Sequence, residues 1–125
     1  MISGKVKKWL PALLEAARSH KGVGRASHAA ALIKGKRCII AINDGRCPHW
    51  LKKYGYWSLH AEAAVMHNIP NEVINGSTLI VIRVTRDGKL AESRPCNKCS
   101  KLLLEKRIKR TYYSTTNGSI ERMDI

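Results

Sequence analysis

Three side chains that bind metals and one carboxylate form a split cluster in this 125-residue chain. His60 and Glu62 are two residues apart, and Cys96 and Cys99 follow 36 and 39 residues after the histidine. One histidine and two cysteines are good zinc ligands, and three protein ligands leave a coordination position open for water, as in catalytic zinc sites. Glu62 adds a proton carrier beside such a water. The cluster therefore predicts one catalytic Zn²⁺ per chain, with Glu62 as the catalytic residue.

The spacing of these residues places them at the starts of two helices. The two cysteines are three residues apart and share one helix face, and Pro95 favours the beginning of a helix just before them. The free N–H groups and the positive dipole end of that first turn favour thiolates. His60 and Glu62 can point at one site only where a helix begins, and Ser58 is a good N-cap for such a helix.

The pattern H-x-E…P-C-x-x-C is typical of zinc deaminases that act on nucleobases. At His60-Ala61-Glu62 and Pro95-Cys96-Asn97-Lys98-Cys99 the chain resembles the cytidine and deoxycytidylate deaminase superfamily, and the resemblance covers about residues 28–116. It implies a hydrolytic deamination in which hydroxide adds to C4 of cytosine, ammonia leaves and uracil remains. The resemblance also implies contacts to the substrate from Asn43, Ala61 and Ser93.

The charge of the chain indicates an anionic partner. Lys and Arg number 23 against nine Asp and Glu, which gives a net charge of +14. Such an excess suits a nucleotide phosphate or a nucleic acid, and it also suits a solvated basic surface. We expect Arg46 and Arg94 to contact a phosphate. Trp57, in the aromatic and basic segment 44–58, is expected to stack on a base; a packed loop or a subunit contact explains that segment equally well.

Hydrophobic patterns predict the order α-β-β-α-β-α-β-β. The first twenty residues form an amphipathic helix with Pro11 in its first turn. Further helices are expected at 58–68 and 95–108, and strands at 29–33, 37–42, 78–84, 109–115 and 119–125. The β-branched run at 78–84 indicates a buried central strand, and Asn117-Gly118 is a strong hairpin signal. With the resemblance, this predicts one domain over residues 1–125 with an α/β, cytidine deaminase-like three-layer fold. Its five-stranded mixed sheet carries helices on both faces and ends in an antiparallel hairpin.

Two features of the chain point to different branches of the superfamily. The final hairpin resembles the free-cytidine deaminases, whereas the His-Ala-Glu motif and the basic charge resemble the deoxycytidylate and nucleic-acid-editing branches. The additional C-terminal helices common in editors are not expected after the hairpin. We therefore predict a cytosine-containing nucleotide, dCMP or CMP, as the substrate. The alternatives are a deaminase of single-stranded DNA or tRNA, and a non-catalytic zinc-stabilised nucleic-acid-binding module.

The four cysteines read as metal ligands and core thiols rather than disulfides, because the start of the chain does not have the pattern of a signal peptide. The sequence contains no run of 18 apolar residues, which is about the length that a membrane-spanning helix needs. We predict a cytoplasmic protein without membrane association. A homo-oligomer is expected, because superfamily members of this size usually build their sites near subunit contacts.

The remaining cysteines and histidines carry weaker expectations. Cys38 lies in an apolar strand and is expected to be a core thiol. A closed four-ligand zinc site completed by Cys47 or His49 is an alternative to the open site, and those two residues are also candidates for a second metal. No role is assigned to His20, His28 and His67.

Overall fold

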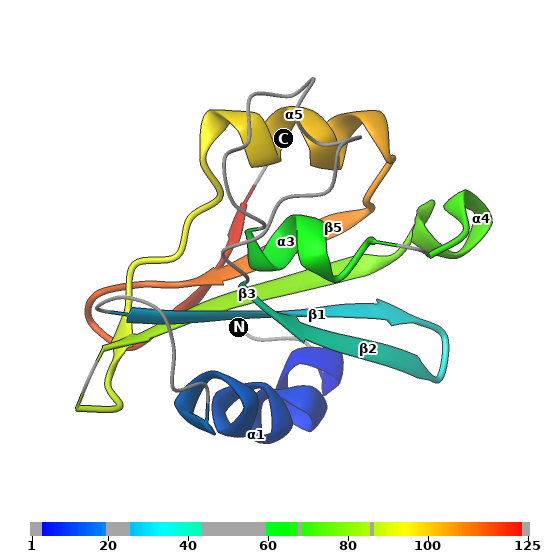
Figure 1. Ribbon diagram of the computed structural model, residues 1–125. Coiled ribbons are helices and arrows are strands. Elements are labelled where there is room, and N and C mark those ends of the chain that lie inside the picture. Colours follow the sequence, from blue (N-terminus) through cyan, green and yellow to red (C-terminus); the bar gives the residue numbers. More distant parts are fainter. Residues whose placement is uncertain (1–3, 20–25, 44–59, 68, 86, 124–125) are drawn as a thin grey trace.

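The computed structural model describes residues 4–19, 26–43, 60–67, 69–85 and 87–123. Within them a mixed sheet is covered by helices on both faces (Figure 1). The elements are, in chain order, α1 (Gly4–Ser19), β1 (Ala26–Lys34), β2 (Arg37–Ile42), α3 (Ala61–Ala64), α4 (Asn71–Ile74), β3 (Thr78–Thr85), β4 (Leu90–Ala91), α5 (Asn97–Glu105), β5 (Arg110–Ser114) and β6 (Ile120–Met123). The predicted α/β architecture is confirmed, with the two-residue β4 as a sixth strand.

The sheet has the order β2-β1-β3-β5-β6. β1 runs antiparallel to both β2 and β3, β3 and β5 are parallel, and β5 and β6 are antiparallel. The predicted hairpin between β5 and β6 is confirmed. Its turn depends on Gly118, whose φ of 85° is costly for any residue with a Cβ. The N–H of Gly118 donates to the carbonyl of Thr115 at 3.0 Å, which closes the turn.

Strand β3 changes its partner along its length. It pairs first with β5 and then, from Arg83 on, with β4. Serine hydroxyls fill the break in the ladder: the Arg83 N–H donates to Ser114 Oγ at 3.1 Å, and Ser114 Oγ donates to the Ala91 carbonyl at 2.6 Å. Ser93 Oγ lies 2.8 Å from Ser114 Oγ and also donates to the Val81 carbonyl. This network fixes the extended segment that enters α5.

Helix α1 covers one face of the sheet, where Val6, Leu13 and Ala17 are buried against β1 and β3. The prediction that Pro11 lies in the first turn is wrong, because the helix begins at Gly4 and Pro11 lies inside it. Proline removes one helix hydrogen bond, but it lies on the exposed side of α1 and the buried side still packs on the sheet. None of the described helices is long and apolar enough to cross a membrane.

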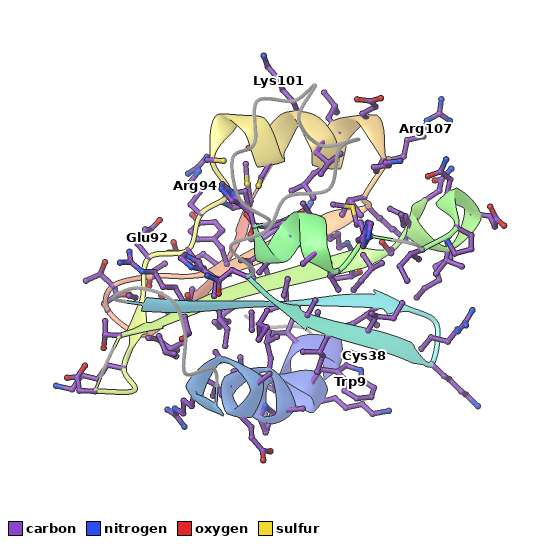
Figure 2. All side chains as sticks on the ribbon, viewed as in Figure 1. Trp9, Cys38, Glu92, Arg94, Lys101 and Arg107 are labelled. Atoms are coloured by element: carbon purple, nitrogen blue, oxygen red, sulfur yellow. The ribbon has the colours of Figure 1, made fainter. Side chains whose placement is uncertain are left out.

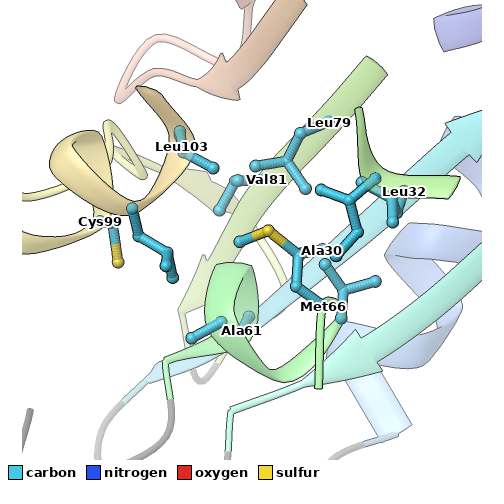
Figure 3. Packing of buried hydrophobic residues seen from close by; sticks show 12 residues of the cluster. Ala30, Leu32, Ala61, Met66, Leu79, Val81, Cys99 and Leu103 are labelled. Atoms are coloured by element: carbon cyan, nitrogen blue, oxygen red, sulfur yellow. The ribbon is translucent and has the colours of Figure 1, made fainter. Parts of the chain in front are cut away.

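Helices α3 and α5 pack on the opposite face, over a cluster that includes Leu79 and Val81 of the central strand (Figure 3). Both helices begin later than predicted. His60 is the N-cap of α3 and Cys96 is the N-cap of α5, whereas Ser58 lies outside the described residues. The one-turn helix α4 was not predicted. These starts bring the two halves of the split cluster to the same side of the sheet.

Candidate active site

The three predicted ligands come together in space. His60 stands at the start of α3, and Cys96 and Cys99 stand in the first turn of α5. Their ligand atoms all lie within 4.8 Å of one another, and they form the one such group among the described residues. Neither His60 nor Cys96 uses its side chain to cap its own helix. The spacing of three between the cysteines, and the position of His60 at a helix start, produce this convergence.

The distances in this group suit zinc. His60 Nδ1 lies 3.4 Å from Cys99 Sγ and 3.8 Å from Cys96 Sγ. Two ligands of a tetrahedral zinc ion, with Zn–N and Zn–S bonds of about 2.0 and 2.3 Å, lie about 3.5 Å apart. The donor set of one imidazole and two thiols is also the set that zinc prefers. The cofactor is Zn²⁺, and His60, Cys96 and Cys99 are positioned to hold it.

Glu62 lies beside the metal ligands without belonging to their group. It is the second residue of α3, its side chain is 5% exposed, and it lines the same cavity as His60 and Cys96. A buried carboxylate is costly unless it is paired or used. Its position brings a carboxylate into the cavity beside the residues that would hold the metal.

The cavity has a volume of about 310 Å³ and is lined by His28, Asn43, His60, Ala61, Glu62, Glu92, Ser93, Arg94 and Cys96. This volume is at the lower end of the range for small-molecule sites. Asn43 Oδ1 accepts a hydrogen bond from the backbone N–H of His28 at 3.2 Å. The side-chain NH₂ of Asn43 is therefore the group that can donate to a ligand. Ala61 opens α3, where a backbone N–H has no partner inside the helix.

Ser93 and Arg94 line the cavity from the extended segment before α5, and Figure 2 shows Arg94 on this segment. The Ser93 N–H donates to the Ser114 carbonyl at 2.9 Å, and its hydroxyl is used within the sheet. These contacts hold Ser93 in place in the cavity wall. The Arg94 guanidinium lies over the ring of Tyr113, 5.7 Å from its centroid, which orients an otherwise exposed cation at the cavity.

Other predicted residues lie elsewhere. Arg46, Trp57, Cys47 and His49 fall outside the described residues, so their expected roles stay predictions. Cys38 lies in β2, half-buried against the α1 side of the sheet and apart from the metal group. Burial raises the pKa of the Cys38 thiol, which fits a core position and confirms the prediction of a core thiol.

Sequence reasoning missed His28 and Glu92, which both line the cavity. His28 lies in β1, opposite Arg83 of β3. Burial, and then the nearby charges of Arg83 and His60, lower the pKa of His28 to about 4. A neutral imidazole therefore lies in the wall at neutral pH. The only signal in the sequence was an isolated histidine ahead of an apolar strand, which is more often a satisfied core residue.

The depressed pKa of His28 predicts a pH-dependent stability. Unfolded His28 titrates near its ordinary pKa of 6.5 and folded His28 near 4, so the unfolded chain binds more protons between these values. Stability linked to His28 is thus fully present above pH 6.5 and decreases as the pH falls. Urea unfolding measures the free energy of unfolding at pH 7 and at pH 5. Between these values the free energy of unfolding of wild type should fall by about 1–2 kcal/mol more than that of His28→Gln, a figure reduced for the partial exposure of His28. Equal losses in the two proteins contradict the neutral, buried imidazole.

The comparisons with known proteins agree with this geometry. Residues 4–115 match the family described as the cytidine and deoxycytidylate deaminase zinc-binding region. No curated protein sequence matches this chain significantly.

Solved structures of similar fold include two mycobacterial enzymes. A cytidine deaminase from Mycobacterium leprae is 20% identical, with a TM-score of 0.58 over 96% of this chain and 94% of that chain. A cytidine deaminase from Mycobacterium tuberculosis is 22% identical, with a TM-score of 0.52 over 88% of this chain and 83% of that chain. These likenesses confirm the predicted fold. The family match extends over most of the sequence and contains all three metal ligands, so this chain belongs to the zinc-binding cytidine and deoxycytidylate deaminase family.

Proposed function

We propose that this zinc deaminase hydrolyses a cytosine-containing nucleotide, with dCMP and CMP favoured, to the uracil product and ammonia. The observation that carries the proposal is the buried carboxylate of Glu62 in the cavity that also holds His60 and Cys96. A binding module would have no need of an acid in that position. Zinc supplies the Lewis acidity that makes water a nucleophile at neutral pH.

The side chains of the cavity account for the remaining chemistry. Glu62 takes one proton from the attacking water and delivers it to the ring nitrogen beside C4, and it then carries the remaining hydroxyl proton from the oxygen on C4 to the departing amine. A C–O bond forms at C4 and the C–N bond to the amino group breaks, so one water is consumed and one ammonia released. Asn43, the Ala61 N–H and the Ser93 carbonyl offer donors and an acceptor to the sugar and the base edge, and Trp57 is proposed to stack on the base.

The phosphate is proposed to bind among basic residues at the mouth of the cavity. Arg94 lines the cavity and is held over Tyr113, and Arg46 is proposed to join it. An arginine offers two parallel N–H donors to a phosphate. A nucleoside has no phosphate and cannot make this contact. The second candidate, a deaminase of single-stranded DNA or tRNA, is supported by the net charge of +14, which suits a longer anion.

An ammonia-release assay with zinc-loaded protein tests these alternatives on cytosine, cytidine, CMP, dCMP, dCTP and single-stranded oligonucleotides. We expect dCMP or CMP to have the highest kcat/KM and the rate to depend weakly on salt, because a mononucleotide neutralises few charges. Faster turnover of oligonucleotides with a steep salt dependence would favour the second candidate. No ammonia from any substrate would favour the zinc-stabilised nucleic-acid-binding module.

We further propose a homo-oligomer in a reducing, cytoplasmic compartment. Leu104 on α5 is a large apolar side chain that is exposed in the described structure, as expected of a subunit contact. Cys96 and Cys99 are positioned with His60 to hold zinc as thiolates, which requires that they stay reduced and so suits the cytoplasm. Light scattering at micromolar concentration should give a mass above 14.0 kDa, the mass of one chain. A fully active monomer contradicts the oligomer.

A further inference from the structure

Two polar side chains, His28 of β1 and Arg83 of β3, lie opposite each other beside the cavity. Arg83 of β3 lies opposite His28 of β1 on one side and opposite Ala91 of β4 on the other. Side chains alternate along a strand, so Arg83 shares its face with Val81, two residues before it. Val81 belongs to the core cluster under α3 and α5. Arg83 therefore points to the face of the sheet that carries the metal ligands.

The Arg83 guanidinium lacks a counterion in the described part of the chain. Its Nε is buried without a hydrogen-bond partner, and none of the described carboxylates lies within salt-bridge distance of it. A buried N–H without a hydrogen-bond partner is unfavourable. A half-buried guanidinium with such a donor is a binding element for an anion that arrives with a ligand.

The location of Arg83 is next to the substrate cavity. Arg83 lies opposite His28 in β1 and opposite Ala91 in β4, and Glu92 is the residue after Ala91. Both His28 and Glu92 line the cavity. The charge of Arg83 already acts on that wall, because it contributes to the lowered pKa of His28. Arg83 itself does not line the cavity, but its side chain is only half-buried, so its outer end can turn toward a ligand that lies between His28 and Glu92.

The backbone around Arg83 is fixed by the same serine network that holds the segment before α5. The Arg83 N–H donates to Ser114 Oγ, and Ser114 in turn contacts Ser93, the residue before Arg94. Two arginines are thus anchored to one junction of the sheet, which suits a group recognised by two cations. Such preorganisation reduces the entropy lost on binding.

We propose that Arg83 recognises the phosphate of the nucleotide substrate at the end of the cavity between His28 and Glu92, an assignment that rests on the proposed function. The cavity of about 310 Å³ suits one nucleotide rather than a longer strand. The Glu92 carboxylate in the same wall disfavours additional phosphates by repulsion. The preferred ligand is therefore a nucleoside monophosphate.

The test compares kcat/KM for dCMP and deoxycytidine in wild type, Arg83→Gln and Arg83→Lys. Arg83→Gln should reduce the dCMP-to-deoxycytidine ratio about ten- to a hundredfold, as expected for loss of a charge-assisted contact. Arg83→Lys should give an intermediate ratio, since lysine keeps the charge without the paired donors. Arg110→Gln is the matched control: Arg110 is exposed on β5 and pairs with Thr78, at the end of β3 away from Arg83. A ratio in Arg83→Gln within twofold of wild type overturns the assignment.

A binding measurement covers the case in which Arg83→Gln fails to fold. Sodium phosphate should raise the Tm of zinc-loaded wild type relative to sodium chloride of equal ionic strength, and the increase should shrink in Arg83→Lys. Equal increases contradict a phosphate site at Arg83. This measurement needs no turnover, so the two proposals can fail separately. If the enzyme releases ammonia but the Arg83 variants behave like wild type, only this inference is refuted. If no substrate is turned over at all, the proposed function is refuted.

The phosphate can also come from a nucleic acid, and the substrates separate the two sources. In the monophosphate assignment, Arg83→Gln lowers kcat/KM for dCMP more than for a single-stranded oligonucleotide containing one cytosine. A larger loss on the oligonucleotide assigns Arg83 to an internal phosphodiester and overturns the monophosphate assignment.

Discussion

Glu62→Gln should reduce kcat by roughly a hundredfold to ten-thousandfold, the usual contribution of general acid–base catalysis. Glutamine has nearly the same volume as glutamate, so it can occupy this 5% exposed position without a cavity or a clash. The amide cannot accept and return a proton. Ammonia release on dCMP measures the loss, and zinc analysis of the same samples should still give one ion per chain because Glu62 is not in the ligand group.

The matched control is Glu72→Gln, the same substitution at an exposed position of α4 away from the cavity. It should retain the wild-type rate. If Glu62→Gln also keeps more than half of the wild-type rate, Glu62 is not the proton carrier and the proposed reaction fails. Loss of zinc from Glu62→Gln would instead give this residue a role in holding the metal.

Cys99→Ala should lose zinc and much of the stability that zinc provides. Cys99 is fully buried at the start of α5 and its Sγ lies 3.4 Å from His60 Nδ1 on α3, so the ion ties two helices together. A ligand that binds only the folded state at a thousand times its Kd adds about 4 kcal/mol. For a domain of this size that amounts to about 10 °C or more in Tm.

Metal analysis and thermal unfolding of Cys99→Ala measure both effects. Cys38→Ala provides the control, because it removes a half-buried thiol from β2 outside the metal group. It should keep one zinc per chain and lose only the packing of one sulfur. Full zinc occupancy in Cys99→Ala would show that the metal is held by other residues.

The parts of the fold that the sequence predicts are those with strong local signals. The β-branched run of β3 and the turn at Gly118 each determine local structure without help from the rest of the chain. The metal ligands were predictable for a different reason, because zinc chemistry allows few residue types and few spacings. His60 and Cys96 could therefore be paired across 36 residues without knowledge of the topology.

The parts that the sequence does not predict depend on tertiary contacts. β4 has only two residues, too few for a periodic pattern, and it exists because β5 leaves half of β3 unpaired. Pro11 is tolerated inside α1 because the buried side of that helix packs on the sheet. Arg83 and His28 look like ordinary interruptions of apolar strands, and only the register between β1 and β3 shows that they lie opposite each other near the cavity.

The parallel pairing of β3 with β5 has a consequence for how the enzyme folds. Antiparallel neighbours can form from adjacent hairpins, but a parallel pair requires a crossover, and here α5 with its two cysteines is part of that crossover. Contacts that close long loops form slowly. During synthesis, His60 emerges well before Cys96, and α5 gains its place on the sheet when β5 pairs. We therefore expect the metal site to assemble late in folding, after β3 and β5 have paired.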